Sequence, residues 1–195
     1  MPHSRTTRVS VTAISKPFVT DKTLHYIPDL FRRWVKAKGT VQRAWFRRWK
    51  GLFSERDLAN ALNQPHYGFG EWRTAIHFRR KGWSVLTSKY THPARIEKRW
   101  CARQVLGADG FRFLMRRRKL GSKRLRRSPK PDLLVFKPGT RRFFFVEVKR
   151  AGDRLSRAQA LFFPMIRRKL RRKVLVVKLK PRKRKSSSIR RVPRR

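Results

Sequence analysis

The chain has 195 residues, of which 55 are Lys or Arg and only 10 are Asp or Glu, so its formal net charge is +45. Such a charge repels itself unless a polyanion neutralises it, and nucleic acid is therefore the expected partner rather than a membrane. Cys101 is the single cysteine, which excludes a disulfide framework and a thiolate zinc site, and we find neither a run of about 20 apolar residues nor a signal peptide pattern.

The first third of the chain is predicted to be a leader followed by a helical extension. Residues 1–21 are polar and mixed, which is typical of a flexible leader. In the basic extension over residues 22–65, apolar side chains recur at helical spacing, and Ser54 with Asp57 predicts a helix start. The aromatic residues between the arginines of 43–49 either form one buried helix face or stack on unpaired bases, and we favour the buried face.

Residues 66–180 are predicted to form an α/β core that carries a basic insertion. Apolar residues between Gly70 and Phe78 give most of one buried helix face, and Gly82 is well placed to end that helix. A first strand is expected over residues 83–87.

The basic insertion covers about residues 90–130. We expect a helix around residues 93–106 and a strand or short helix at 111–114. Two runs of Lys and Arg, at 116–119 and 123–127, are either a solvated face or a grip on the backbone of a bound nucleic acid, and the sequence favours neither.

A β-hairpin is predicted next. Two apolar runs, 132–136 and 143–148, are joined by Pro-Gly-Thr, and a two-residue turn at Gly139-Thr140 would pair position 138 with 141 and position 136 with 143. In that register Asp132 lies opposite Glu147, with their Cβ atoms roughly 5 Å apart.

The hairpin brings charged side chains onto one surface. Successive side chains of a strand alternate between faces, so Lys149 shares the face of Glu147 and Asp132 while Val148 points the other way. Two carboxylates at this distance repel each other, and the arrangement makes sense mainly if a cation lies between them.

The last part of the core is predicted to be a helix and a strand. Ser156-x-x-Gln159 matches a capping box that opens a helix to about Leu170, and Val174–Leu179 is an apolar run typical of a strand buried on both faces. Residues 181–195 are strongly basic and are predicted to be a disordered tail.

The order Pro131-Asp132, hairpin, Glu147-x-Lys149 resembles the PD-(D/E)xK phosphodiesterase superfamily. The residues that follow, Gly152-Asp153-Arg154-Leu155-Ser156-x-x-Gln159, narrow the resemblance to the VRR-NUC (virus-type replication-repair nuclease) family. It extends from about residue 131 to 179 and more loosely over 70–89, and it departs from many relatives at Lys130, where they have glycine.

The resemblance implies a fold and a location. We expect an α/β, restriction-endonuclease-like core: a mixed central sheet of about four strands flanked by helices on both faces, behind the helical N-terminal extension and before the disordered basic tail. A cytoplasmic, nucleic-acid-associated protein of bacterial or phage origin is expected.

The resemblance also implies a metal site. Asp132 and Glu147 would be carboxylate ligands of Mg²⁺, with Mn²⁺ as a substitute, and the main-chain carbonyl of Val148 would be a third ligand. Lys149 would orient or deprotonate the attacking water and offset charge in the transition state.

Other site residues are less sharply indicated. Relatives often carry a fourth acid on the first core helix, where it binds the metal or orients a metal-bound water as part of the catalytic set. Glu71 is the favoured match and Glu55 the rival, although an acid in the first turn of a helix also suits the helix dipole. Gln159 either contacts the site or only caps its helix, and Asp153 is left outside the catalytic set as a loop-stabilising residue.

The predicted function is therefore metal-dependent hydrolysis of DNA, with branched, flapped or junction DNA in replication, repair or recombination as the implied substrate. RNA is kept open as a substrate, and a homodimer is kept open as the active form. The alternative is a non-enzymatic nucleic-acid-binding scaffold built on an inactivated nuclease fold, which the charge alone would support.

Overall fold

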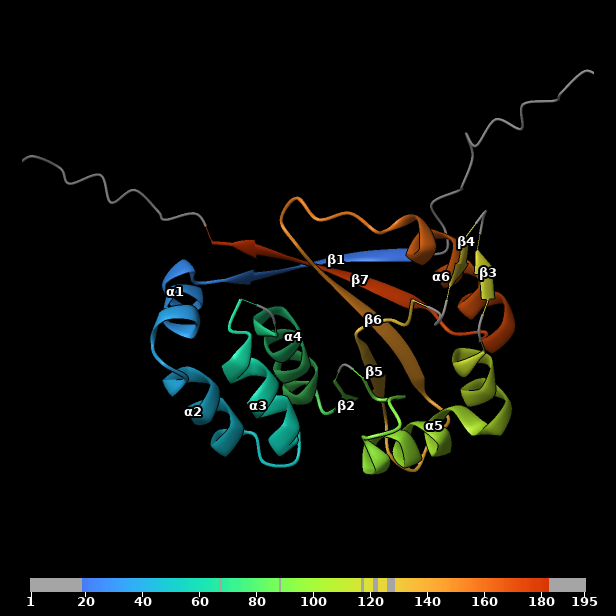
Figure 1. Cartoon of the computed structure of the whole chain (residues 1–195), viewed down its shortest axis with the longest axis horizontal. Coiled ribbons are helices and arrows are strands. Elements are labelled where there is room, and N and C mark those ends of the chain that lie inside the picture. Colours follow the sequence, from blue (N-terminus) through green and yellow to red (C-terminus); the bar gives the residue numbers. More distant parts are fainter. Residues whose placement is uncertain are drawn as a thin grey trace, which may run out of the picture.

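A computed structural model describes residues 19–182, apart from 67, 88, 117, 121–122 and 126–128 (Figure 1). Its helices are α1 (Pro28–Lys36), α2 (Thr40–Arg48), α3 (Glu55–Asn63), α4 (Phe69–Arg80), α5 (Ile96–Met115) and α6 (Arg157–Leu170). Its strands are β1 (Val19–Tyr26), β2 (Ser84–Leu86), β3 (Arg118–Leu120), β4 (Lys123–Leu125), β5 (Leu133–Phe136), β6 (Phe143–Arg150) and β7 (Val174–Pro181). Most of the predicted leader and tail, and part of the two charge runs, lie outside the described residues.

One mixed sheet with the strand order β1-β7-β6-β5-β2 forms the centre of the fold. Strands β2, β5 and β6 are antiparallel neighbours, whereas β7 and β1 run parallel to β6. Helix α6 makes the crossover between the parallel strands β6 and β7, as a parallel connection requires. The α/β prediction is confirmed, with five strands in the sheet instead of about four.

Strand β1 accounts for the difference and corrects the sequence analysis. Residues 19–26 were assigned to the end of the leader and the start of a helical region, and both assignments are wrong here. The segment pairs with β7 along its whole length, from Val19 opposite Val174 to Tyr26 opposite Pro181. It is an edge strand, and among residues 20–26, whose exposure is described, only Leu24 is buried, so the sequence carries little of the apolar signal that marks a strand.

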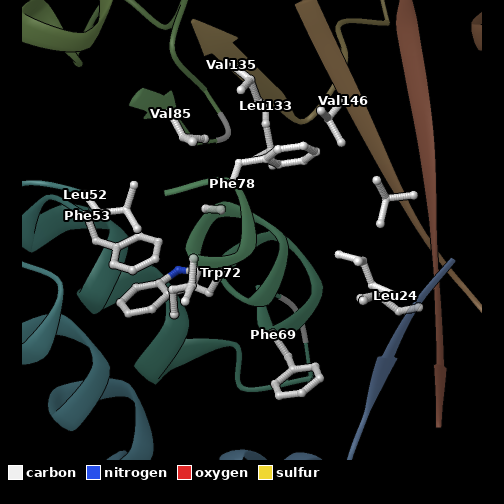
Figure 2. Close-up of a cluster of buried hydrophobic side chains, with 14 of the residues drawn as sticks. Leu24, Leu52, Phe53, Phe69, Trp72, Phe78, Val85, Leu133, Val135 and Val146 are labelled. Atoms are coloured by element: carbon white, nitrogen blue, oxygen red, sulfur yellow. The ribbon is translucent and has the colours of Figure 1, made fainter. Parts of the chain in front are cut away.

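The sheet separates two hydrophobic cores, one on each face. Leu133, Val135 and Val146 point toward helices α1–α4, where they meet Phe78, Trp72 and their neighbours (Figure 2). The alternate residues Leu134 and Phe145 point the other way, into a second core formed with α5 and α6. Since side chains alternate along each strand, the same two strands supply both cores.

The aromatic run at 43–49 belongs to the first core. Trp45 packs 5.3 Å from Trp34 and 6.0 Å from Phe69, measured between ring centroids, and Phe46 and Trp49 also pack against the core. The structure therefore supports the buried-face interpretation over base stacking.

The hairpin β5–β6 has the predicted register but a different turn. Phe136 lies opposite Phe143, as expected. The turn, however, is closed by the Thr140 N–H donating to the Lys137 carbonyl, which places Pro138 and Gly139 at its centre, and Gly139 has a φ of 68°. Proline has no N–H for the predicted pair with position 141 and suits the second position of a turn, so the loop is wider than two residues.

The helix boundaries follow local signals. Both predicted capping boxes are present, with Ser54 and Asp57 at the start of α3 and Ser156 and Gln159 at the start of α6. The insertion holds α5, in which Gly107 (φ 71°) interrupts the helical backbone, followed by the small hairpin of β3 and β4 beside α6 (Figure 1). Residues 111–114 are thus helical. None of the helices in the described residues has the length and apolar character needed to span a membrane.

Candidate active site

The hairpin places Asp132 and Glu147 together. The last pair of the β5–β6 ladder is Leu133 opposite Val146, so Asp132 comes directly before β5 at the position opposite Glu147. Lys149 lies two residues further on β6, and its Nζ is 2.7 Å from Oε1 of Glu147. Glu147 is only 2% exposed, which makes it a charged group buried in the face of the sheet that α5 and α6 cover.

The backbone of Val148 faces the same place. The Lys137 N–H donates to the Arg142 carbonyl, and every second residue pair of an antiparallel ladder is hydrogen-bonded. If the ladder continued beyond Leu133 and Val146, Pro131 and Val148 would be one of these hydrogen-bonded pairs. The Val148 N–H donates instead to Oδ2 of Asp132, at 2.8 Å. Because proline has no N–H, the Val148 carbonyl, which points to the same edge, has no ladder donor from position 131. This geometry gives Pro131 a physical role, since it does not occupy the Val148 carbonyl beside Asp132 with a ladder hydrogen bond.

Gln159 joins the site to helix α6. Its Nε2 donates to Oε1 of Glu147 at 2.6 Å, and its Oε1 accepts from Nζ of Lys149 at 3.1 Å and from the Ser156 N–H at 3.0 Å. The two roles that the sequence left as alternatives therefore coexist. The residue that caps α6 also holds Glu147 and Lys149 in place.

The two carboxylates are electrostatically unfavourable as they stand. Burial raises the pKa of Asp132 well above its usual range, and the negative charges of Glu147 and Glu71 add to the rise. Burial also raises the pKa of Glu147, against the opposing influence of Lys149 and Gln159. A cation between the two groups would relieve both the repulsion and the loss of hydration.

Tyr90 is a site residue that the sequence analysis missed. It is 1% exposed and its hydroxyl donates to the carbonyl of Pro131 at 3.2 Å. Burial, with the negative charges of Asp132 and Glu147, raises the pKa of this hydroxyl, so Tyr90 stays protonated as a donor. Tyr90 follows β2 in the chain, and only the pairing of β2 with β5 brings it to Pro131, so no local pattern could have indicated it.

Comparison with known families finds a match over this region. Residues 99–179 match the model of the VRR-NUC domain. This segment is similar to VRR-NUC domains. It contains Asp132, Glu147, Val148, Lys149 and Gln159, and it implies a nuclease-type function for the chain. No curated protein matches the chain.

Glu71 lies outside the VRR-NUC match but beside its carboxylates. It occupies the first turn of α4, and its charge acts on Asp132. The preceding Gly70 makes this approach possible, because a Cβ there would come within 2.8 Å of Leu179 and 3.0 Å of Val148. The rival Glu55 is exposed in the first turn of α3, where its charge suits the helix dipole. The structure thus brings Glu71, and not Glu55, near Asp132.

Asp153 stabilises the loop between β6 and α6. Its Oδ2 accepts from the Arg150 N–H at 3.0 Å, and its own N–H donates to the Arg150 carbonyl. The intervening Gly152 has a φ of 91°, a conformation that glycine adopts readily. These contacts agree with a loop role for Asp153.

The site has a donor set that suits a hard cation. Within the part of the chain that the structure describes, no three His, Cys, Asp or Glu side chains converge closely enough to bind a metal by themselves. Magnesium, however, is usually held by one or two carboxylates and keeps several waters. Oε2 of Glu147 is buried without a hydrogen-bond partner, which leaves a carboxylate oxygen ready for such an ion. The residues therefore fit Mg²⁺.

A second buried acid, also missed as a site neighbour, lies next to Glu71. Asp57 accepts from Nζ of Lys98 at 2.5 Å, and Arg95 lies 3.8 Å away. Thr87 links to both Asp57 and Lys98, and Glu71 attracts the Lys98 ammonium. A hollow of about 240 Å³ between α3 and α4 is lined by Asp57, Glu71 and Thr87 among others. This cluster joins the N-terminal extension to α5 at the border of the site.

Proposed function

We propose that this chain is a metal-dependent nuclease that hydrolyses phosphodiester bonds in DNA. The observation that carries the proposal is the pair of half-buried Asp132 and buried Glu147, in which one Glu147 oxygen has no hydrogen-bond partner and Lys149 lies against the other. The net charge of +45 supports a polyanionic substrate.

Asp132, Glu147 and the carbonyl of Val148 would hold Mg²⁺, with Mn²⁺ as a substitute. When bound, the ion supplies charge relief at the phosphoryl oxygens and lowers the pKa of a coordinated water. The protein's part is to present two carboxylates and one carbonyl in a fixed arrangement, which the Val148–Asp132 and Gln159–Glu147 hydrogen bonds support.

Lys149 would orient the attacking water and donate to a phosphoryl oxygen as negative charge grows there. Glu147 and Gln159 both hold its Nζ, and its side chain is 15% exposed, so the ammonium is fixed at the rim of the carboxylate pair. Glu71, on the α4 side, would accept a hydrogen bond from a water at this rim.

Branched, flapped or junction DNA is the proposed substrate, with replication, repair or recombination as the setting. The VRR-NUC resemblance supports this choice. Two symmetric cuts in a four-way junction would require two copies of the site, so a homodimer is part of the proposal for that substrate.

The test is cleavage of labelled linear, flapped and four-way-junction DNA, and of the matching RNA, with Mg²⁺, Mn²⁺ or EDTA. Glu147→Gln keeps the size of the side chain and removes its charge, so we expect cleavage to fall by about 10³-fold or more, as when a preorganised charge is removed from an active site. Affinity for DNA, measured in EDTA, should be unchanged or slightly higher, because a negative charge is removed.

Glu55→Gln is the matched control, since it makes the same substitution at an exposed glutamate in the first turn of a helix. It should cut like the wild type, whereas Glu71→Gln should be impaired. Undiminished cleavage by Glu147→Gln would contradict the assignment. Tight DNA binding without cleavage in any metal would favour the non-enzymatic scaffold.

A further inference from the structure

A groove lined by cations lies at the opposite end of the sheet from Asp132 and Glu147. We call it the distal groove. It has a volume of about 810 Å³ and extends between the start of β6, the end of α6 and the start of β7. Its six cationic residues are Arg141, Arg142, Arg167, Arg171, Arg172 and Lys173.

Carboxylates are missing from the lining of this groove. All ten acidic residues of the chain lie in the segments that the structure describes, and none of them lines the distal groove. Six cations with no acid in the lining produce a positive potential that the groove does not itself cancel. Low-dielectric walls strengthen such a potential.

Neutral groups hold several of these cations in place. The Arg172 guanidinium donates to the carbonyls of Arg141 at 2.9 Å and Arg171 at 3.2 Å, and it lies over Phe143 at 4.6 Å from the ring centroid. Lys173 lies over Phe144 at 5.4 Å. Carbonyls and aromatic rings orient a cation without neutralising it, so the charges are arranged in advance for an anionic ligand.

The Nε atom of Arg172 gives an independent sign that a partner is missing. It is buried and has no hydrogen-bond partner among the described residues. Buried N–H groups are nearly always satisfied, and a charged one left unpaired is costly. A bound phosphate at this guanidinium would add charge-assisted hydrogen bonds to the neutral ones it already makes.

The separation from the candidate active site suits one continuous DNA. Phe143 in the groove and Lys149 in the site are both on β6, six residues apart, which corresponds to about 20 Å along the strand. About six base pairs of DNA span that length. A DNA bound at the active site could therefore reach the distal groove with one arm.

We propose that the distal groove is a second nucleic-acid-binding site, which binds the phosphodiester backbone of a DNA arm that extends from the cleavage site. The inference rests on the proposed function for its substrate. If the groove binds in this way, tight binding requires a DNA arm of a minimum length. Because the groove would contact the phosphate backbone, binding there would depend on where the arm lies and not on its base sequence.

The test uses the full chain and one labelled cleavage site flanked by arms of about 4, 8 or 16 base pairs, lengths chosen around the six-base-pair span. In the groove variant, Arg142→Gln, Arg171→Asn and Lys173→Gln remove three exposed cations, and Asn is used at position 171 because the backbone there has a φ of 51°. A control variant, Arg33→Gln, Arg47→Gln and Arg48→Gln, removes three exposed cations from α1 and α2. A charge-retaining variant carries Arg142→Lys, Arg171→Lys and Lys173→Arg.

Binding in EDTA should strengthen for the wild type once the arm exceeds about six base pairs, and the groove variant should lose this gain by about tenfold. Its affinity for the shortest arm should match that of the control variant. The slope of log affinity against log salt for the longest arm should fall by up to about 2.7, or about 0.9 for each phosphate that the variant no longer neutralises. The charge-retaining variant should bind like the wild type.

Equal reductions in affinity for the groove and control variants at every arm length would overturn the inference. Thermal melting and cleavage of the shortest DNA check that the groove variant is folded. If the wild-type protein never cuts but still shows the arm-length effect, the proposed nuclease function is refuted and the DNA-binding role of the distal groove is supported. If the protein cuts but shows no arm-length effect, the nuclease function is supported and the DNA-binding role of the distal groove is refuted.

Discussion

Two buried acids in this fold have opposite surroundings. Asp57 is 6% exposed and is surrounded by donors: the Ser54 N–H and hydroxyl, the Thr87 hydroxyl and the Lys98 ammonium. Glu147, at 2% exposed, has one oxygen held by Lys149 and Gln159 and the other without a partner.

The pKa values of these acids are shifted in opposite directions, downward for Asp57 and upward for Glu147 and its neighbour Asp132. Burial disfavours the charge of Asp57, but Lys98 and Ser54 outweigh burial and hold its pKa below the usual range. Burial and like charges raise the pKa of Asp132, and burial raises that of Glu147. A carboxylate that accepts several hydrogen bonds and faces two cations stabilises the fold, whereas a crowded pair with an open oxygen is arranged for a ligand.

The largest stability effect that would test this contrast is expected at Asp57. Asp57→Ala removes the α3 capping partner and the ion-pair partner of the buried Lys98 and Arg95, so we expect a loss of about 3–5 kcal/mol in unfolding free energy. Asp132→Asn, measured in EDTA, should keep or raise stability, because it removes one of two repelling charges. Chemical denaturation measures both variants.

The control for Asp57 is Asp29→Ala, which breaks the exposed ion pair with Arg32. Its effect should lie within about 0.5 kcal/mol. If Asp132→Asn destabilised the metal-free protein as strongly as Asp57→Ala, the contrast between the two clusters would not hold.

An effect of intermediate size is expected at Gln159, where variants can distinguish its role as the cap of α6 from its role in positioning Glu147 and Lys149. Gln159→Ala should reduce activity about 10–100-fold, since it removes the hydrogen bonds that orient Glu147 and Lys149. Ser156→Ala removes the capping hydroxyl but leaves Gln159 in place, so stability should fall by about 1 kcal/mol with little change in activity. Steady-state cleavage rates and melting curves distinguish the two, and equally reduced activity in both variants would refute the positioning role.

The smallest expected effect is on how the unfolding free energy changes at acidic pH. Burial lowers the pKa of His77 to about 4, and Lys22, Lys81, Arg73 and Arg80 act in the same direction. The unfolded chain takes up the proton near pH 6.5, so stability should fall as pH drops from about 6.5 toward 4. His77→Gln should flatten this part of the curve.

The Asp57 contribution changes in a different pH range. Its folded pKa is lowered, so its stabilisation is present above pH about 4 and is lost only as the pH falls below that value. Unfolding free energies measured from pH 7 to pH 3 would separate the two groups. An unchanged slope between pH 6.5 and 4 in His77→Gln would show that another group is responsible.

Local signals in the sequence predicted much of the fold around the site. The hairpin register followed from the two apolar runs and a short turn between them, although the turn was predicted at Gly139-Thr140 and is observed at Pro138-Gly139. Both capping boxes followed from residue pairs three apart. These features depend on neighbours in the chain. Strand β1 was missed because its pairing with β7 joins segments about 155 residues apart, from Val19 to Val174, and an edge strand needs few apolar side chains.

The sequence by itself predicted a polyanionic partner, the α/β class and the opposition of Asp132 to Glu147, because charge, hydrophobic periodicity and two apolar runs around a turn can all be recognised locally. Only the tertiary structure decided that Glu71 and not Glu55 lies beside Asp132, that Tyr90 holds Pro131, and that Asp57 pairs with Lys98. Each of these depends on which helix packs against which strand. Packing is decided by the complementary shapes of distant segments, as the close approach of Gly70 to Val148 and Leu179 illustrates.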